Sequence, residues 1–447
     1  MDNDAGLLRR RWPLILLFGV IATLGYLGQL IPSILLQPTK ADLRLSDTTI
    51  GLINGLGVTV IGALAAFPIG YAADRYGRKN VLVGSILVWS AFLVVVGLAR
   101  NPTEFALGIM GFNIGDAAML PLIYAMLATR FHGPARETAN AILVAIFLLG
   151  ASGVYAVGGY MLAFFEEHPV ADIASWRQVC FLVALLGPLI AAPLLFLKRA
   201  AEDEGVDPQT VGVPSQTSEP ESQPTSYIEY VRKNGWLIAA VMIAISVYYT
   251  AYGVLLFWAP AILERAFGLA SQEANIRMGE TLLVATAGAI AVLLLVIPKA
   301  LKVWGHAASI LFVIIGCVVM LLPTIGLFFV ETADGFLLMI AVAAFGMSGT
   351  MMLVPGLLQA CAPDQFRSRT IALFPTMSGL MRIGMPALVG TLSTQFGEGG
   401  EALLQIITWL VLGSLCISIA ALTFLLKRFV RLAQMNLAEP VRPSTAI

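Results

Sequence analysis

Long apolar segments alternate with short polar ones along almost the whole chain. Twelve of these segments approach the ~20 residues that an α-helix needs to cross a bilayer. They span residues 13–37, 48–73, 80–99, 103–128, 138–164, 176–197, 235–263, 277–298, 306–330, 335–361, 369–395 and 402–426. The first follows three arginines but is too long, and lacks a clear small-residue cleavage site, to be a signal peptide. The pattern predicts an all-α membrane protein with twelve transmembrane helices.

One long polar stretch divides the spans into six and six. It is rich in Pro, Ser, Gln and Glu, a composition that cannot bury a core and predicts a flexible linker. The two halves also register at an offset of 228 residues, with Pro32 matching Pro260 and Gly77 matching Gly305. Duplicated helical halves around a central site are typical of transporters. The predicted parts are a six-helix bundle over 1–197, a linker over 198–234, a second six-helix bundle over 235–430 and a tail over 431–447.

Composition supports a lipid environment and excludes several functions. The chain is 58% hydrophobic and 12% charged, whereas soluble domains carry about 25% charged residues. Its net charge of zero gives no reason to expect a nucleic-acid partner. The four cysteines show no CxxC spacing, so neither a disulfide framework nor a metal site is expected. With no P-loop and no nucleophile–base arrangement, we expect neither an enzyme nor a bound cofactor.

The basic residues indicate the orientation in the membrane. With the N-terminus placed in the cytoplasm, 20 of the 27 basic residues fall on the cytoplasmic side, six fall on the other side, and Arg382 lies within a span. Cytoplasmic loops carry an excess of Lys and Arg. The pattern therefore predicts a multi-pass protein of the cell (inner) membrane with both termini in the cytoplasm.

The loop between the second and third spans, GYAADRYGRKN, carries a specific motif. It resembles the G-x-x-x-D-R-x-G-R-K signature of the major facilitator superfamily, and this resemblance implies two six-helix bundles that work by alternating access. The residues that match, and that we expect to act in gating, include Gly70, Asp74, Arg75, Gly77 and Arg78. A glycine in the helix permits a close helix crossing, and one in the loop permits a tight turn. The resemblance implies that the aspartate braces the N-terminal end of the eleventh span, where helix-dipole charge is positive.

Three further segments resemble the spinster-like branch of that superfamily. They are Tyr26–Ile53, Gly111–Met126 and the stretch GVLLFWAPAILERAFGLASQEA in the seventh span. The resemblance implies a proton-coupled or facilitative carrier of lipid-like or other amphiphilic organic molecules.

The chain departs from this branch at its charged positions. The branch typically carries Asp-Arg in the first span and, in the fourth, a Glu with an Arg one or two turns before it. Here Gly28 and Gln29 replace the Asp-Arg pair, Ile109 replaces the fourth-span Arg, and only the acid is kept, as Asp116.

Asp116 is the one formal charge in the segment MGFNIGDAAMLPLIYAM. It lies about 13 residues, roughly 20 Å, into the fourth span. An acid at that depth should face the bundle interior or a water-filled cavity, and burial favours its protonated form. It is therefore a candidate for proton coupling. The structural alternative is an aspartate hydrogen-bonded to a neighbouring helix or to Asn113, one turn earlier.

Candidate solute-binding residues come from both halves. Arg382 lies about as deep in the eleventh span, where a guanidinium suits a carboxylate or phosphate; it could equally pair with Asp116 or a backbone carbonyl. The seventh span is rich in rings, which either bind an apolar ligand or pack in the core. The full set of candidates is Tyr26, Gln29, Asn113, Tyr124, Tyr248, Tyr249, Tyr252, Trp258 and Arg382.

These features predict a secondary carrier, proton-coupled or facilitative, for a small amphiphilic organic solute such as an organic or aromatic acid. Its partners are then that solute, protons and the lipid bilayer, and the chain is expected to act as a monomer. Two alternatives stay open: an exporter of lipid-like or drug-like compounds, and a non-transporting membrane sensor or membrane enzyme on the same scaffold.

Overall fold

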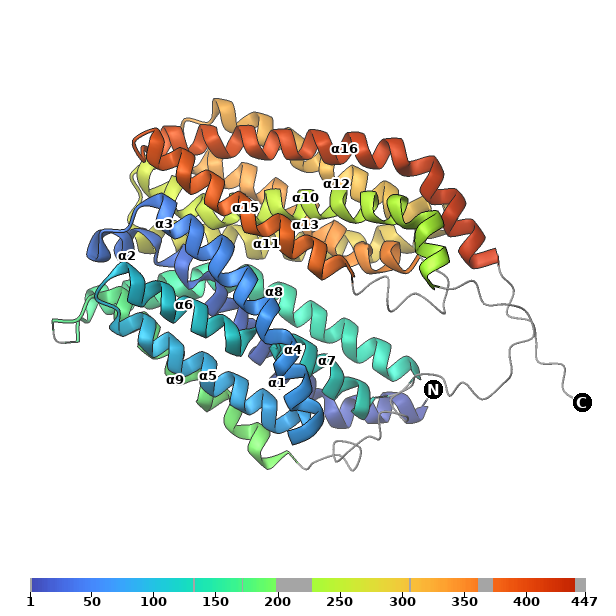
Figure 1. Ribbon diagram of the computed structural model, residues 1–447, viewed down its shortest axis with the longest axis horizontal. Helices are drawn as coiled ribbons and strands as arrows, with labels where there is room; N and C mark the ends of the chain where they lie inside the picture. Colours follow the sequence, from blue (N-terminus) through green and yellow to red (C-terminus); the bar gives the residue numbers. More distant parts are fainter. Residues whose placement is uncertain are drawn as a thin grey trace, which may run out of the picture. The chain divides into compact units, whose positions relative to one another are not determined.

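A computed structural model describes residues 2–131, 133–170, 172–197, 227–304, 307–360 and 373–438, and the regular structure in these ranges is entirely helical (Figure 1). The first half of the chain forms α1 (Asp2–Ile34), α2 (Leu36–Leu43), α3 (Asp47–Leu52), the π-helix η1 (Ile53–Gly57), α4 (Val58–Tyr76), α5 (Arg78–Leu98), α6 (Pro102–Asp116), α7 (Met119–Arg130), α8 (Gly133–Glu167) and α9 (Ser175–Phe196). The second half forms α10 (Tyr227–Phe267), α11 (Ser271–Trp304), α12 (Ala307–Gly326), the short 3-10 helix η3 (Leu327–Phe329), α13 (Ala333–Ala360), α15 (Leu373–Gln395) and α16 (Gly400–Ala438).

The predicted fold class is confirmed. Within the described residues, eleven helical segments are long and apolar enough to cross a membrane. The eleventh predicted span, 369–395, begins outside the described residues and continues as α15. Most of the predicted linker (198–226) and the end of the predicted tail (439–447) also lie outside the described residues.

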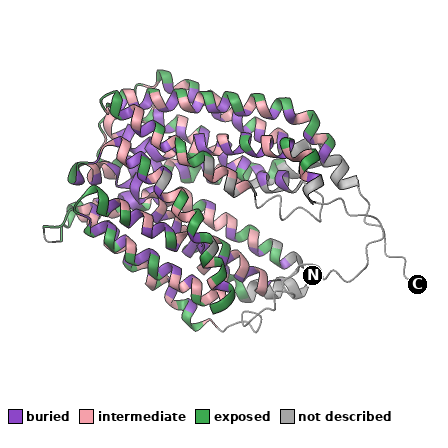
Figure 2. Ribbon diagram, viewed as in Figure 1, coloured by how far each residue is buried: buried purple, intermediate pink, exposed green. Residues whose placement is uncertain are grey.

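Exposed apolar side chains indicate that the outer faces of the helices lie against lipid. Large hydrophobic residues are exposed on every long helix, and Phe196, Leu295 and Phe424 are 86%, 71% and 69% exposed. Figure 2 shows exposed positions recurring along the helices, as on α16. A soluble monomer rarely exposes large contiguous apolar patches, so these faces are suited to lipid.

The contacts divide the chain into two compact units. Unit 1 comprises Met1–Glu219, Phe257–Leu283 and Pro386–Leu403, and unit 2 comprises Pro220–Leu256, Val284–Met385 and Leu404–Ile447. Unit 1 therefore combines the first six spans with the ends of α10, α11 and α15. In unit 1, α1 packs along α8, and α5 packs against both α6 and α9; in unit 2, α12 packs along α13.

A buried tryptophan occupies the centre of unit 1 in a slot made by glycines. Trp89 of α5 is 1% exposed, and its ring lies 5.5 Å from that of Phe112. A Cβ added at Gly28 would lie 2.8 Å from the Trp89 ring, one at Gly115 2.6 Å from its backbone nitrogen, and one at Gly187 3.0 Å from the ring. These approaches are too close for a side chain, so α1, α6 and α9 can pack around Trp89 only through glycine.

We expect Gly28→Ala to destabilise the protein because its new methyl group would collide with Phe112 and Trp89. Overpacking of this kind costs about 1–3 kcal/mol. Gly84→Ala in α5 is the matched control, since a Cβ there would meet nothing within 4 Å. The thermal unfolding midpoint in detergent should fall for Gly28→Ala and stay unchanged or rise slightly for Gly84→Ala. Equal thermal midpoints in the two variants would show that packing around Trp89 does not require glycine at position 28.

Candidate functional site

The fourth span is interrupted directly after Asp116. The helix α6 ends at Asp116, α7 begins at Met119, and Ala118 between them has φ −109° and ψ −5°. Pro121 explains the interruption, because proline has no N–H and its ring clashes with the carbonyl four residues earlier, here that of Ala117. A proline is tolerated in the first turn of the new helix. The sequence predicted a continuous span here, although Pro121 was a visible signal for the break.

The carboxylate of Asp116 lies against α1. Its Oδ2 accepts a hydrogen bond from Nε2 of Gln29, and a Cβ added at Gly25 would lie 2.9 Å from its Oδ1. Asp116 is partly buried, so its carboxylate is neither fully exposed nor fully enclosed in the core. Gly25 thus makes room for the acid, and Gln29 offers it a neutral donor rather than a fixed positive charge.

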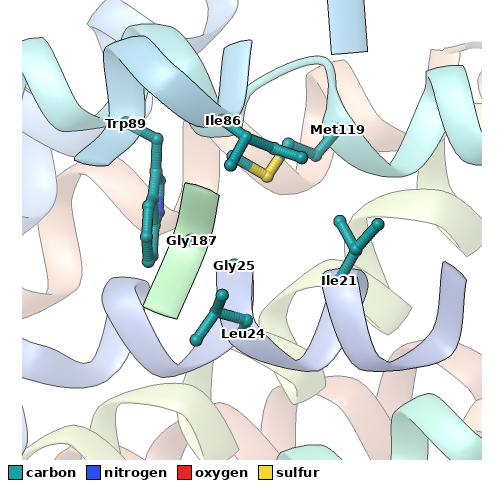
Figure 3. A pocket seen from close by; sticks show the side chains of 7 residues that line it. All are labelled: Ile21, Leu24, Gly25, Ile86, Trp89, Met119 and Gly187. Atoms are coloured by element: carbon teal, nitrogen blue, oxygen red, sulfur yellow. The ribbon is translucent and has the colours of Figure 1, made fainter. Parts of the chain in front are cut away.

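A small apolar pocket adjoins this contact. It has about 10 Å³ of free space, room for about one water molecule, and is lined by Ile21, Leu24, Gly25, Ile86, Trp89, Met119 and Gly187. Figure 3 shows its walls coming from α1, α5, α7 and α9. Because drug-sized ligand sites enclose roughly 300–1,000 Å³, this pocket is too small for an organic solute in this conformation.

The other candidates in the first half differ in exposure. Tyr26 and Tyr124 are partly exposed, and the ring of Tyr26 packs edge-on against Phe147 at 5.6 Å. Asn113 is 4% exposed, and its side-chain nitrogen donates to the carbonyl of Ile109 at 2.7 Å. In this conformation Asn113 therefore bonds to its own helix and is buried.

The aromatic candidates on α10 separate into buried and partly exposed rings. Tyr248 is fully buried in unit 2, and its hydroxyl accepts a hydrogen bond from Thr350 of α13 at 3.3 Å. Tyr249 and Tyr252 are partly exposed in the same unit. Trp258, which lies in unit 1, is fully buried. Burial matches the core-packing alternative for Tyr248 and Trp258, and leaves Tyr249 and Tyr252 as the accessible rings.

Arg382 is exposed on α15 and forms no ion pair with the described residues of unit 2. An unpaired guanidinium within a membrane-spanning helix is stable only where water reaches it. Its guanidinium is not enclosed within unit 2.

The loop signature forms a compact turn. Gly77 has φ +85°, which allows α4 to end and α5 to begin without an intervening loop. Arg78 donates to the carbonyl of Ala125 in α7 at 3.4 Å, and Lys79 donates to two carbonyls at the end of α9, the shorter bond measuring 3.0 Å. These bonds fix the turn against its neighbours. The predicted role of Gly77 in a tight turn matches this geometry.

The remaining signature residues are exposed. Arg75 lies over the ring of Tyr76, 5.5 Å from its centroid, and Asp74 is exposed at the end of α4. The close helix crossing expected at Gly70 is not present among the described residues, because a Cβ there would meet nothing within 4 Å. The crossing at Gly70 stays a prediction. Residues 369–372, where Asp74 is expected to bind, lie outside the described residues.

A polar cluster that sequence reasoning missed lies at the other end of the second span, within unit 1. The side chain of Asp47 is fully buried; its carboxylate binds Lys40 at 2.7 Å and Arg265 at 2.6 and 2.9 Å. Ser393 donates to the same carboxylate at 2.6 Å. Glu398 binds Lys40 and also accepts from the backbone N–H of Asp47 at 2.9 Å. The sequence offered one signal: Lys40 and Arg265 are two of the six basic residues on the side with few positive charges.

Two opposing effects set the pKa of Glu398. Burial raises it, but the hydrogen bonds from Lys40 and from the backbone of Asp47 outweigh burial and hold the pKa below its ordinary value. Glu398 is therefore ionised at neutral pH, and its bond to Lys40 weakens only as the pH falls through this lowered pKa.

Long apolar helices that hold isolated charges beside a helix break define a polytopic membrane protein of the transporter type. The chain belongs to the Major Facilitator Superfamily, whose family model matches residues 14–386. It is thus a transporter rather than an enzyme, as the sequence predicted. Its solved structural relatives include a bacterial homologue of the human lysosomal transporter spinster, in an inward-facing and unoccupied conformation. That structure has a TM-score of 0.71 and 19% identity, and the match covers 97% of this chain and 99% of that one. The resemblance to the spinster-like branch is confirmed.

Two relatives are similar in sequence. An MFS-type efflux pump of Mycolicibacterium smegmatis is 27% identical over 426 residues, covering 92% of this chain and 93% of the pump. A gallate transporter of Pseudomonas putida is 29% identical over 189 residues, covering 41% of this chain and 38% of that protein.

Pro121→Ala should close the break after Asp116. The new N–H can bond to the carbonyl of Ala117, so α6 and α7 would join and the thermal midpoint should rise. Transport should slow about tenfold if re-bending the helix costs about 1.4 kcal/mol. Pro193→Ala is the matched control, because Pro193 lies inside the uninterrupted α9. Amide hydrogen exchange at residues 117–122 measures the change directly, and unchanged exchange there would contradict this account.

Proposed function

We propose that the protein is a proton-coupled carrier of a small amphiphilic organic acid. The observation that carries the proposal is the position of Asp116, at a helix break and hydrogen-bonded to the neutral Gln29. The neutral amide of Gln29 stabilises the ionised carboxyl less than a cation would, so a change in the surroundings of Asp116 can shift its protonation. Discontinuous helices are the typical site of solute and ion binding in transporters.

Two observations favour an organic acid as the solute: the exposure of Arg382 and the similarity to one named transporter. An exposed guanidinium in a membrane-spanning helix suits a carboxylate, and the partly exposed rings of Tyr249 and Tyr252 suit an aromatic or apolar body. The transporter similar to this chain in Pseudomonas putida is named for gallate, an aromatic acid. We propose that these residues, with Tyr26, Gln29 and Tyr124, contact the solute.

Export of lipid-like or drug-like compounds is the second candidate. It is favoured by the efflux pump, which matches 92% of this chain. In either case we propose a monomer in the cell membrane with both termini in the cytoplasm, and a gate at the loop signature in which Asp74 braces the start of the eleventh span.

Asp116→Asn should abolish accumulation driven by a pH gradient because the amide cannot carry the proton. Exchange of solute down its own gradient should partly remain, and Asp116→Glu should keep some coupling. Gallate uptake and counterflow in proteoliposomes at about pH 5–8 measure both activities. If the Asn variant accumulates gallate fully, Asp116 is structural.

Arg382→Gln should raise the KM for gallate about tenfold or more, the loss of a charge-assisted hydrogen bond of about 1.5–3 kcal/mol. The pH-gradient dependence should survive, since Arg382 carries no proton in the cycle. Competition by lipophilic dyes separates the two candidate functions. If dyes are transported and gallate is not, and Arg382→Gln leaves dye transport intact, export is the better assignment.

A further inference from the structure

An arginine lies against two aromatic rings at one end of unit 2, where α10 begins and α16 ends. The guanidinium carbon of Arg428 in α16 is 5.0 Å from the ring centroid of Trp236 in α10 and 5.3 Å from that of Phe424. Ser418 of α16 donates to the carbonyl of Ala244 in α10 at 2.9 Å. The two helices are therefore in direct contact and run antiparallel, and Figure 1 shows the start of α10 and the end of α16 at the same end of the unit.

Five cations gather around this contact. They lie within about two turns of each other along the two helices, and all are exposed: Arg232, Lys233, Lys427, Arg428 and Arg431. Within the part of the chain that the structure describes, none of them forms an ion pair. We call these five cations, with the rings of Trp236 and Phe424, the α10–α16 patch. Its positive charge is not neutralised by described carboxylates.

The lengths of the two helices place the α10–α16 patch at the surface of the bilayer. Arg428 lies 28 positions after Gly400, the first residue of α16, which is roughly 42 Å along the helix. Trp236 lies 31 positions before Phe267, the last residue of α10, or roughly 46 Å. A bilayer with its headgroups is about 40–45 Å thick. We propose that the α10–α16 patch binds the headgroup of an anionic phospholipid.

Arg428 is positioned to bind a phosphate group. The flat guanidinium carries paired N–H donors that match two oxygens of one phosphate. Contacts with aromatic rings hold the guanidinium without using these donors, and Arg428 donates no hydrogen bond to the described residues. The other four cations add an attraction for negative charge that acts over the whole patch. Basic sites between membrane helices are a typical place for anionic headgroups.

The apolar surface next to the cations favours a lipid over a soluble phosphate. On α16, Phe424 and Ile417 lie two turns apart on one face and are 69% and 63% exposed. On α10, Trp236 and Ile243 have the same spacing and are 53% and 39% exposed. Both pairs run from the patch toward the middle of the membrane. Acyl chains can therefore lie along these faces while the headgroup stays at the cations, and a soluble phosphate would gain nothing from them.

Hydrogen exchange with and without added lipid tests the proposal. The wild-type protein in a neutral detergent is mixed with dioleoyl phosphatidylglycerol or with dioleoyl phosphatidylcholine, which has the same chains and a zwitterionic headgroup. We expect phosphatidylglycerol to slow amide exchange at residues 230–236 and 424–432 at least about threefold, because a bound ligand reduces local opening. Phosphatidylcholine and soluble glycerol phosphate should have little effect there. The measurement needs neither solute nor gradient, so it is independent of the proposed transport function and orientation.

Matched variants separate this site from general attraction to negative charge. Arg428→Gln should weaken the apparent affinity for phosphatidylglycerol about tenfold or more, since it removes charge-assisted hydrogen bonds. Arg428→Lys should lie between the two, because lysine keeps the charge and loses the paired donors. Arg136→Gln is the control: Arg136 is exposed near the start of α8 in unit 1 and contacts no ring among the described residues.

A second pair of variants tests the rings at constant charge. Trp236→Leu should also weaken the affinity, because Arg428 loses the ring of the neighbouring helix. Trp409→Leu should not, although Trp409 is an equally exposed tryptophan of α16, since it packs against Phe328. Thermal midpoints show that each variant is folded. Equal protection by phosphatidylcholine, equal protection by glycerol phosphate, or an equal loss of affinity in Arg428→Gln and Arg136→Gln would overturn the proposal.

Discussion

The cost of placing a charge in a low-dielectric membrane governs this structure. A charged side chain at the bilayer centre is destabilising by several kcal/mol unless it meets water or a partner. Three charged sites meet this constraint in three ways. Asp116 contacts a neutral amide at a helix break, Arg382 is exposed, and Asp47 is fully buried among two cations and a hydroxyl. The first two solutions correspond to the tasks proposed here: changing protonation and attracting an anion.

Asp116 and Asp47 show how strongly the partner decides the behaviour of an acid. Two cations beside Asp47 stabilise its ionised form. Asp116 has the neutral donor Gln29 where the spinster-like branch typically carries an arginine. Such a donor stabilises a carboxylate less than a full charge does.

Much of the fold could be predicted from the sequence because lipid makes the hydrophobic pattern unusually informative. Segment lengths gave the spans, and Gly77 gave the turn between α4 and α5. The charged cluster around Asp47 could not be predicted in this way, because Asp47 and Arg265 are 218 positions apart and only packing brings them together. For the same reason, the sequence did not separate the buried Tyr248 from the partly exposed Tyr252, although both lie on one face of α10.

The departure from the branch at positions 28 and 29 has a physical explanation in the packing of unit 1. Phe112 and the Trp89 ring fill the space in which a side chain at position 28 would lie, so an aspartate cannot fit there. Without that acid, an arginine at position 29 would lose a neighbouring negative charge and would face Asp116 alone. A glutamine avoids this fixed ion pair while keeping a donor for Asp116. Direct contacts thus link Trp89 to Gly28 and Gln29 to Asp116. The glycine at position 28, where the branch has an aspartate, explains why position 29 holds a glutamine and not an arginine.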